Sequence, residues 1–305
     1  MGTAHAKAIL IGEHAAVYGA PAMAIPVLDA VANARLAPAE RGILETELYR
    51  GPVEGAPSGL TPVIIALHHA LQRVGYPTGG ASLAVTSNIP MRRGLGSSAT
   101  VAAAVVDAVV AATGIQLDQW TRWELVQEAE TVAHGTPSGI DAAAVLASGP
   151  IFYRRGQSQS VPVGGDGFTF VLADTGEPSS TATAVARVRQ RRDHKPAFVD
   201  SRIEKLADLT HAAAEACQAG SVHLVGAAMN EGQEALRDLG VSCDSLDRLV
   251  ESARDAGAVG AKLTGGGMGG CIIALAPTGG ADALAAVLRT SGATRTWIST
   301  MEAAA

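Results

Sequence analysis

The chain has 305 residues, of which 48% are hydrophobic and 17% are charged, with 35 glycines and a formal net charge of −6. This composition excludes a disordered chain and predicts one large domain or two domains of ordinary size, of which we favour two. The negative charge provides no basic surface for nucleic acid or an anionic membrane, so a small molecule is the better expectation for a ligand.

Cysteine usage and the N-terminus indicate a cytoplasmic protein. Cys217, Cys243 and Cys271 are odd in number and far apart, without a CxxC pair, which argues against a disulfide framework and a zinc site. The first residues lack the charged and apolar regions of a signal peptide. The most apolar stretch, residues 99–112, is shorter than the roughly 20 residues that a bilayer requires and contains Asp107, so we expect a buried helix.

The first half of the chain begins with predicted strands and ends with predicted helices. Short apolar runs bounded by Gly, Pro or acidic residues predict strands, at residues 6–11, 22–28, 31–36, 44–49 and 82–86. Apolar periodicity predicts helices at residues 61–74, 97–112 and 119–133.

The second half is mainly helical, with strands at its start and near its end. Strands are predicted at residues 151–153, 168–173, 259–263 and 271–276. Helices are predicted at residues 181–192, 199–216, 222–239 and 245–256, and a last helix and strand close the chain. A Gly/Ser-rich passage at residues 156–167 is the candidate boundary between domains at residues 1–160 and 161–305.

A glycine-containing turn joins a predicted strand to the apolar helix that begins near residue 97. Gly94 and Gly96 allow the backbone to turn tightly and to approach a ligand. The helix that begins at Ser97 and Ser98 directs N–H groups and its positive dipole end at that ligand, which favours a phosphate-binding loop. No Gly-Lys-Ser/Thr sequence of a Walker A loop occurs in the chain. The alternative is a serine-capped helix after an ordinary turn.

A second glycine-rich loop lies between two predicted strands, at residues 265–270. It matches GxGxxG, but in a dinucleotide-binding unit a helix follows this motif, whereas here a strand is predicted to follow. Five glycines around Met268 exceed what a simple chain reversal needs. We therefore expect a loop that closes over a bound group, with a flexible hairpin as the alternative.

One carboxylate is predicted to point into the interior. Glu130 lies seven and four positions after Trp123 and Val126 on a predicted helix, so the three side chains share one face. A buried carboxylate is costly unless it is paired or bound to a metal. Glu130 is therefore a candidate metal ligand, and an ion pair with a Lys or Arg is the alternative.

Two further candidates are weak when each is taken alone. Asp141 starts an apolar helix after a loop rich in Gly and Pro, where an Asp is commonly only a cap. Lys7 lies within an apolar strand that is followed by Glu13 and His14, and a lone Lys on a strand is usually a surface charge. The spacing of the histidines matches no zinc motif.

Together, these segments resemble the motifs of a known family. Residues 7–18, 90–99 and 262–271 resemble, in the right order, the three motifs of the GHMP kinases, and residues 134–141 add a fourth similarity. Within the family, Glu13 and His14 with their neighbours are similar to members that phosphorylate mevalonate, whereas a galactokinase would have Asp-Tyr after Gly-Glu-His. The resemblance implies ATP-dependent phosphorylation of the C5 hydroxyl of mevalonate, giving 5-phosphomevalonate and ADP in the mevalonate route to isoprenoids.

The resemblance also implies a fold and a setting. The expected fold is α+β, the two-domain GHMP kinase fold, with a ribosomal protein S5 domain 2-like, ATP-binding N-terminal domain and a ferredoxin-like C-terminal domain. The family further implies a homodimer and no nucleic-acid or membrane partner. The alternatives are another GHMP small-molecule kinase, acting on phosphomevalonate or a sugar, and a non-catalytic sensor. A sensor would be expected to have lost Asp141, Lys7, Glu130 or Ser98, and all are present.

The family's functional residues map onto this chain one by one. The resemblance makes Asp141 the catalytic base and Lys7 its cationic partner. Ser98 and Glu130 match the Mg²⁺ ligands, which suits the hard oxygen donors that Mg²⁺ prefers. The expected contacts to mevalonate are Glu13, His14, Asp141 and Thr181. The expected ATP-binding residues are Pro90, Arg92, Gly94, Leu95, Gly96, Ser97, Ser98, Ala99, Gly265, Gly266 and Gly267.

Overall fold

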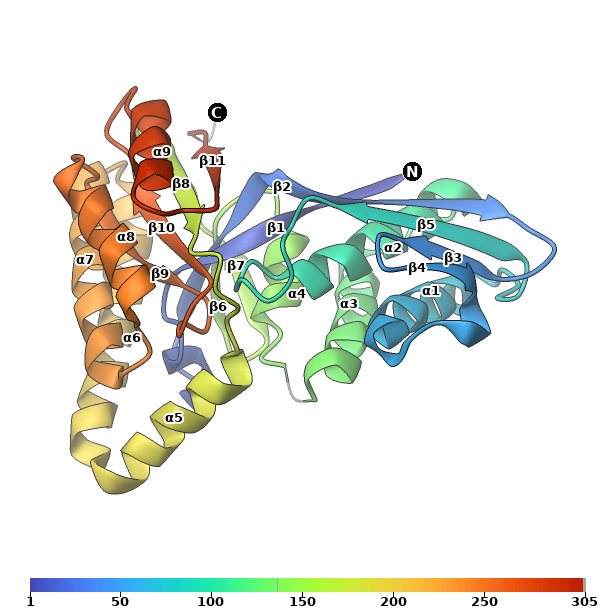
Figure 1. The fold of residues 1–305 in the computed structure, drawn as a ribbon, viewed down its shortest axis with the longest axis horizontal. Helices are drawn as coiled ribbons and strands as arrows, with labels where there is room; N and C mark the ends of the chain where they lie inside the picture. Colours follow the sequence, from blue (N-terminus) through green and yellow to red (C-terminus); the bar gives the residue numbers. More distant parts are fainter. Residues whose placement is uncertain (136, 304–305) are drawn as a thin grey trace. The chain divides into compact units, whose positions relative to one another are not determined.

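The computed structural model describes residues 1–135 and 137–303 of the chain (Figure 1). Within this part, contacts divide the chain into two compact units, and neither unit is continuous in sequence. Unit 1 comprises Met1–Ala6, Ala30–Met91 and Gly96–Leu146, and unit 2 comprises Lys7–Asp29, Arg92–Leu95 and Ala147–Ala305.

Unit 1 contains a mixed sheet. Strand β3 (Ile43–Thr46) pairs antiparallel with β4 (Tyr49–Pro52) and parallel with β5 (Ala81–Ser87), and β5 pairs antiparallel with the second half of β2 (Ala22–Pro38). The prediction of one strand over residues 44–49 is wrong. The chain reverses there, because Thr46 Oγ1 accepts hydrogen bonds from the N–H groups of the two residues at 48 and 49.

Strand β2 is one long strand where the sequence predicts two. Asp29 was the expected break, but the strand continues through it, and Leu28 and Asp29 are both exposed. Every residue of the strand before Leu28 is buried, and from Ala30 to Ala34 buried residues alternate with partly buried ones, without a break in the strand. Strand β1 (Gly2–Ile11) also pairs with β2 and begins four residues before the predicted start.

Unit 2 contains two sets of paired strands. The first half of β2 pairs antiparallel with β6 (Ile151–Arg154), which pairs with β7 (Gln157–Ser160). The second sheet is antiparallel with the order β11-β8-β10-β9. Its strands are β8 (Phe168–Asp174), β9 (Gly260–Thr264), β10 (Cys271–Leu275) and β11 (Arg295–Met301).

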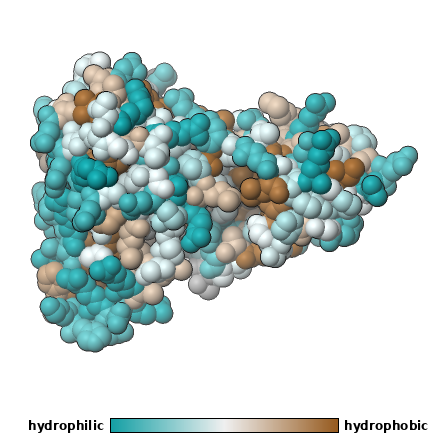
Figure 2. Space-filling model, in the orientation of Figure 1, coloured by the Kyte–Doolittle hydropathy of each residue, from teal (hydrophilic) through white to brown (hydrophobic). Residues whose placement is uncertain are grey.

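The helices of unit 2 start and end close to their predicted limits. They are α5 (Thr181–His194), α6 (Pro196–Gln218), α7 (Val222–Leu239), α8 (Asp244–Asp255) and α9 (Ala281–Thr290). Short 3-10 helices occur at Ala15–Tyr18, Val53–Gly55 and Ser58–Leu60. No helix in the described ranges is long and apolar enough to cross a membrane. The surface over α5 and the start of α6, at the lower left of Figure 2, is largely hydrophilic.

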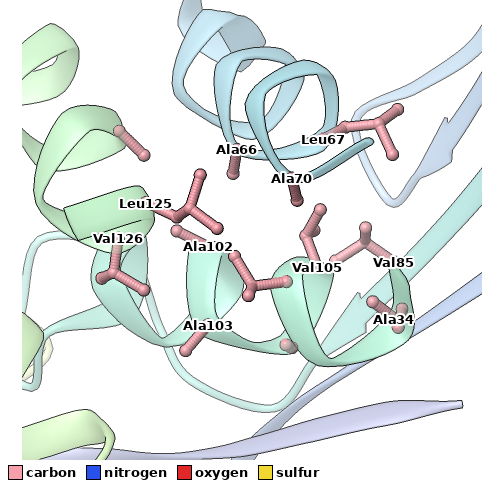
Figure 3. Packing of buried hydrophobic residues seen from close by; sticks show 14 of the residues in the cluster. Ala34, Ala66, Leu67, Ala70, Val85, Ala102, Ala103, Val105, Leu125 and Val126 are labelled. Atoms are coloured by element: carbon pink, nitrogen blue, oxygen red, sulfur yellow. The ribbon is translucent and has the colours of Figure 1, made fainter. Parts of the chain in front are cut away.

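The core of unit 1 is built from small side chains. Helices α1 (Thr61–Arg73), α2 (Ser97–Thr113) and α3 (Gln119–His134) pack on one another, and α4 (Ile140–Val145) contacts α2 and α3. Alanines and valines of α2 face α1 and α3 (Figure 3). Small residues allow helices to approach closely, so α2 is buried on most of its surface, as the sequence predicts.

Candidate active site

The start of α2 has the form of an anion-binding turn. Its N-cap residue, Gly96, has φ 69°, a left-handed conformation that glycine adopts without a side-chain penalty. Thr100 Oγ1 donates a hydrogen bond to the Gly96 carbonyl oxygen at 2.8 Å and fixes the turn. The N–H groups of the first helical turn have no partner within the helix, which is the arrangement that phosphate groups bind.

Glu130 lies beside the start of α2. Its exposed fraction is 2%, which confirms the prediction that it faces the interior. Ser98 Oγ donates a hydrogen bond to Glu130 Oε1, and His134 Nε2 lies 3.3 Å from Ser98 Oγ and 3.8 Å from Glu130 Oε2. The last turn of α3 and the first turn of α2 thus bring Ser98, Glu130 and His134 together.

The oxygen atoms of Ser98 and Glu130 fit a magnesium ion. Mg²⁺ binds few protein ligands and takes its other ligands from water and substrate phosphates. In the described ranges, no three His, Cys, Asp or Glu side chains are arranged to hold a metal by themselves. The donor set therefore suits a metal that arrives with phosphate groups better than zinc, which needs three or four protein ligands.

Helix α3 also positions the loop that leads to Asp141. Gln127 Nε2 donates to the Pro137 carbonyl oxygen at 3.2 Å, and Trp123 Nε1 donates to the Gly139 carbonyl oxygen at 3.4 Å. Gly139 has φ 86° and is the N-cap of α4, which carries the half-buried Asp141 in its first turn. Thr136, part of the motif noted in the sequence, lies outside the described residues.

In unit 2, the second half of β1 holds Lys7 in a buried position. Lys7 is 3% exposed, so the alternative of a surface charge is wrong. Its Nζ donates to the Gly94 carbonyl oxygen and its backbone N–H donates to the Leu95 carbonyl oxygen, both at 3.1 Å. Lys7 therefore binds the first part of the predicted phosphate loop directly.

That part of the loop, Arg92–Leu95, is fixed to unit 2 by an ion pair. Arg93 Nε lies 2.9 Å and 3.1 Å from the two carboxylate oxygens of Asp174, and Arg93 Nη2 donates to the Gly176 carbonyl oxygen at 2.9 Å. The exposed fractions of the two charged side chains are 17% and 5%. A Cβ on Gly94 would lie 3.0 Å from the Thr264 carbonyl oxygen, so only glycine fits this contact well.

Glu13, His14 and Lys262 form a second buried polar group in unit 2. Lys262 is fully buried, and its Nζ forms an ion pair with Glu13 and donates to the Leu263 carbonyl oxygen at 2.6 Å. Burial raises the pKa of Glu13 and lowers the pKa of Lys262, because both lose hydration of the charged form, while their mutual attraction opposes both shifts. Burial also lowers the pKa of His14, and the charge of Lys262 adds to this effect.

Two atoms of this group have no hydrogen-bond partner. His14 Nε2 donates to the Gly266 carbonyl oxygen at 2.9 Å, which leaves Nδ1 as the acceptor of the neutral ring. Glu13 Oε2 and His14 Nδ1 are both buried without a partner in the described part of the chain. Such atoms are rare in folded proteins and are typical of sites that bind a ligand or an ordered water.

The glycine-rich loop between β9 and β10 is held on several sides. Ser179 Oγ donates to the Gly267 carbonyl oxygen at 2.8 Å, and Met268 N–H donates to the Val241 carbonyl oxygen at 2.7 Å. A Cβ on Gly266 would lie 2.8 Å from Thr181 Cα, so the backbone at 266 packs against the start of α5. The predicted strand–loop–strand unit is confirmed, and the loop brings Thr181 beside the glycines.

The expected site residues divide between the two units. Unit 1 contains Pro90, Gly96, Ser97, Ser98, Ala99, Glu130 and Asp141, and unit 2 contains Lys7, Glu13, His14, Arg92, Gly94, Leu95, Thr181, Gly265, Gly266 and Gly267. Three polar residues within this set of contacts were missed by sequence reasoning as functional candidates: Lys262, Arg93 and Asp174. Signals were available, because Arg93 and Lys262 lie within residues 90–99 and 262–271, which resemble family motifs, and Lys262 is a single charge within an apolar strand, as Lys7 is.

Comparison with known proteins identifies the class. Residues 62–149 match the family described as "GHMP kinases N terminal domain", and residues 213–294 match "GHMP kinases C terminal". A Thermococcus sibiricus protein named mevalonate kinase is 32% identical over 298 residues, covering 91% of this chain and 89% of its own length. The Aeropyrum pernix protein of the same name is 34% identical over 284 residues, covering 90% and 87%. The chain therefore belongs to the GHMP kinase family.

Solved structures agree on the fold. The solved structure described as "L. major mevalonate kinase in complex with R-mevalonate" aligns with a TM-score of 0.86 and 26% identity, covering 100% of this chain and 96% of that one. The two-domain GHMP kinase fold with mixed α and β content, expected from the resemblance, is thereby confirmed.

Proposed function

We propose that the chain is a kinase that transfers the γ-phosphoryl group of ATP to the C5 hydroxyl of mevalonate, giving 5-phosphomevalonate and ADP. The observation that carries the proposal is the buried Glu130 beside Ser98 at the start of α2, a phosphate- and metal-binding arrangement. Relatives that match 91% of the chain are named mevalonate kinase, and they support the choice of substrate.

Asp141 is the proposed base and Lys7 its cationic partner. Phosphoryl transfer depends mainly on positioning and on neutralising spread negative charge, with a base to take the hydroxyl proton. Asp141 would accept that proton as the hydroxyl oxygen attacks. Lys7, whose ammonium group is buried, would stabilise the negative charge that develops on the hydroxyl oxygen.

ATP and Mg²⁺ are the proposed cofactors. The N–H groups at the start of α2, together with Pro90, Arg92 and residues 94–99, would bind the phosphates, and Gly265, Gly266 and Gly267 would support them. Ser98 and Glu130 would hold the ion with their oxygen atoms. When bound, Mg²⁺ neutralises charge on the transferred phosphoryl group.

Substrate contacts are proposed for Glu13, His14, Asp141 and Thr181. The unpaired Glu13 Oε2 and His14 Nδ1 support this role, because a substrate hydroxyl can donate to either atom. We further propose that the enzyme acts in the cytoplasm as a homodimer, without a nucleic-acid or membrane partner, and that residues 1–160 and 161–305 are its sequence domains.

An assay of ADP formation with a panel of acceptors tests the proposal. We expect phosphorylation of mevalonate, and little or none of phosphomevalonate, galactose or homoserine, in the presence of ATP and Mg²⁺. If phosphomevalonate or a sugar were the best acceptor, the chain would be a different GHMP kinase. If no acceptor were phosphorylated while ATP still bound, the sensor alternative would hold.

Asp141→Asn then tests the mechanism. Asparagine keeps the size of the side chain but cannot accept the proton, so turnover should fall by about 10²–10⁴-fold with little change in ATP affinity. Lys7→Met should also be slow, and the two effects should not add, because both residues act on one proton transfer. Retention of more than about a tenth of wild-type turnover by Asp141→Asn would show that another group is the base.

A further inference from the structure

A basic segment of unit 2 stands out against the acidic chain. Between Thr181 and Asp200 the sequence contains five Arg or Lys residues and two Asp residues, whereas the whole chain has a net charge of −6. The segment covers α5 and the start of α6.

Several of these cations line one cavity. A cavity of about 340 Å³ at the C-terminal end of α5 is lined by Arg187, Gln190, Arg191, His194 and Lys195. These positions follow a spacing of three or four residues, so they lie on one face of the helix. The cavity is a depression that is open to solvent, has no acidic residue in its lining and has room for a small polar ligand.

Two carboxylates close to this segment, Asp200 and Asp238, already have other partners. Arg192 Nε lies 2.6 Å from Asp200 Oδ1, and Arg202 Nε lies 2.6 Å from Asp238 Oδ2. Within the described part of the chain, no ion pair is formed by the cations that line the cavity, Arg187, Arg191 and Lys195. Among the described residues, no direct ion pair therefore neutralises these three charges.

Helix dipoles account for only part of the charge. Arg187 and Arg191 lie against Gly240, the C-cap of α7, since a Cβ there would be 3.1 Å from Arg191 Nη1 and 3.7 Å from Arg187 Nε. Lys195 is the C-cap of α5. Each helix C-terminus carries about −0.5 charge, so the two ends offset roughly one of the positive charges. Of the three positive charges of Arg187, Arg191 and Lys195, about two therefore remain. This matches in magnitude the negative charge of a phosphate group near neutral pH.

One hydrogen-bonding atom of the lining has no acceptor among the described residues. Arg191 Nε is buried and has no hydrogen-bond partner in the described residues, although the Arg191 guanidinium is held over the Phe198 ring at 5.4 Å. His194 Nδ1 donates to the Gln190 carbonyl oxygen at 2.7 Å. A buried guanidinium N–H without an acceptor is rare, because its desolvation is not compensated.

We infer that this cavity, lined by Arg187, Arg191, His194 and Lys195, binds the phosphate group of a small molecule at a site separate from the phosphate loop before α2. The arginines would donate paired N–H bonds to the phosphate oxygens, and Lys195 would add a point charge. The inference does not depend on which hydroxyl compound the enzyme phosphorylates.

Calorimetric titration with inorganic phosphate and pyrophosphate tests this site. The enzyme is first saturated with Mg²⁺ and a non-hydrolysable ATP analogue, so that the phosphate loop is occupied, and the titration is run at about 0.15 M salt. We expect one binding event. Arg191→Gln and, separately, Arg187→Gln should each weaken it by about tenfold or more, because each removes a charge-assisted hydrogen bond.

Lys205→Gln is the matched control. It removes one positive charge from α6. Lys205 Nζ lies 3.0 Å from Glu231 Oε2, and Lys205 is not part of the cavity lining. This variant should bind phosphate like the wild type. Absence of binding to the wild type, or equal weakening in Lys205→Gln and in both arginine variants, would overturn the inference and leave only a basic surface. If Arg191→Gln does not fold, the comparison of Arg187→Gln with Lys205→Gln tests the inference, because Arg187 is exposed.

Discussion

At the scale of single residues, the ion pair between Glu13 and Lys262 places two opposite charges in the interior of unit 2. The exposed fractions of the two side chains are 2% and 0%, so neither charge can be hydrated if its partner is lost. The pair joins positions 249 residues apart in the sequence. No spacing rule could connect them, whereas the helical period was sufficient to predict that Glu130 is buried. A strand buried on both faces has no alternation of polar and apolar residues, so the sequence pattern around Lys262 does not indicate its partner.

Lys262→Met should lower the free energy of unfolding by about 3–5 kcal/mol, because it leaves Glu13 buried and unpaired. Combining it with Glu13→Met should restore much of the loss, since burying two apolar side chains avoids both desolvation costs. Urea unfolding followed by circular dichroism measures the difference. Lys205→Met, which breaks an exposed pair, should cost less than about 1 kcal/mol. Equal losses in the two single variants would contradict this account of the pair.

His14 predicts a pH dependence of stability. Burial lowers its pKa below the ordinary value of 6.5, so the folded protein binds fewer protons here than the unfolded chain as the pH falls through that value. Stability should therefore decrease below about pH 6.5, with a slope from this residue of at most about 1.4 kcal/mol per pH unit.

Thermal unfolding from pH 7.5 down to the acid limit of solubility, compared between the wild type and His14→Gln, isolates this contribution. The variant should lose less stability on acidification than the wild type. His223→Gln, which changes an exposed histidine, should follow the wild type. Parallel curves for the wild type and His14→Gln would show that the buried ring does not control the slope.

At the scale of elements, predictions succeed where both ends of an element carry local signals. Helix α7 was predicted at residues 222–239 and spans Val222–Leu239, because Ser221 caps its start and Gly240, with φ 78°, ends it. Strand β2 lacks such signals, and Asp29 was mistaken for a stop. Strand β2 pairs with β6 before Asp29, at residues 22–24, and with β5 after it, at residues 32–38. This pairing outweighs the local preference of Asp29.

The glycine-rich loop gives a test at the same scale. Gly267 has φ 79°, and a Cβ there would lie 2.2 Å from the Val241 carbonyl oxygen. Gly267→Ala must therefore displace backbone and adopt a strained conformation, and it should destabilise the protein by about 1–3 kcal/mol or more.

Gly149→Ala is the control, because Gly149 has no positive φ and no atom within 4 Å of a Cβ. Melting temperatures of both variants, with and without an ATP analogue, separate loss of stability from loss of binding. A Gly267→Ala variant as stable as Gly149→Ala would show that the loop relaxes freely and is not held as the hydrogen bonds indicate.

At the scale of the whole molecule, the order of motifs along the chain was enough to predict the family and its fold. The composition of the compact units was not predictable in this way. Arg92–Leu95 belongs to unit 2 although the chain on both sides of it belongs to unit 1. Arg93 of this segment pairs with Asp174 of the same unit, a contact that no local sequence pattern predicts.

Unit 2 consists of three separate segments of the chain, so we expect that no single continuous fragment folds as unit 2. A fragment of residues 147–305 keeps the sheet of β8 to β11 but lacks Glu13, Arg93 and the strand segment that pairs with β6. We expect it to unfold without cooperativity, as measured by circular dichroism in urea, and co-expression with residues 1–146 to restore a cooperative transition. A fragment that unfolds with the midpoint of the full chain would contradict this.

Because Lys262 is buried, its chemical reactivity can report local opening of the strand that carries it. The sequence has four lysines, of which Lys7 and Lys262 are buried, while Lys195 and Lys205 are accessible. An amine-acylating reagent should modify the accessible pair at once and Lys262 only when the strand that carries it separates from Glu13. The acylation rate at Lys262, measured by peptide mass spectrometry, would then give the frequency of such openings under native conditions, without denaturant.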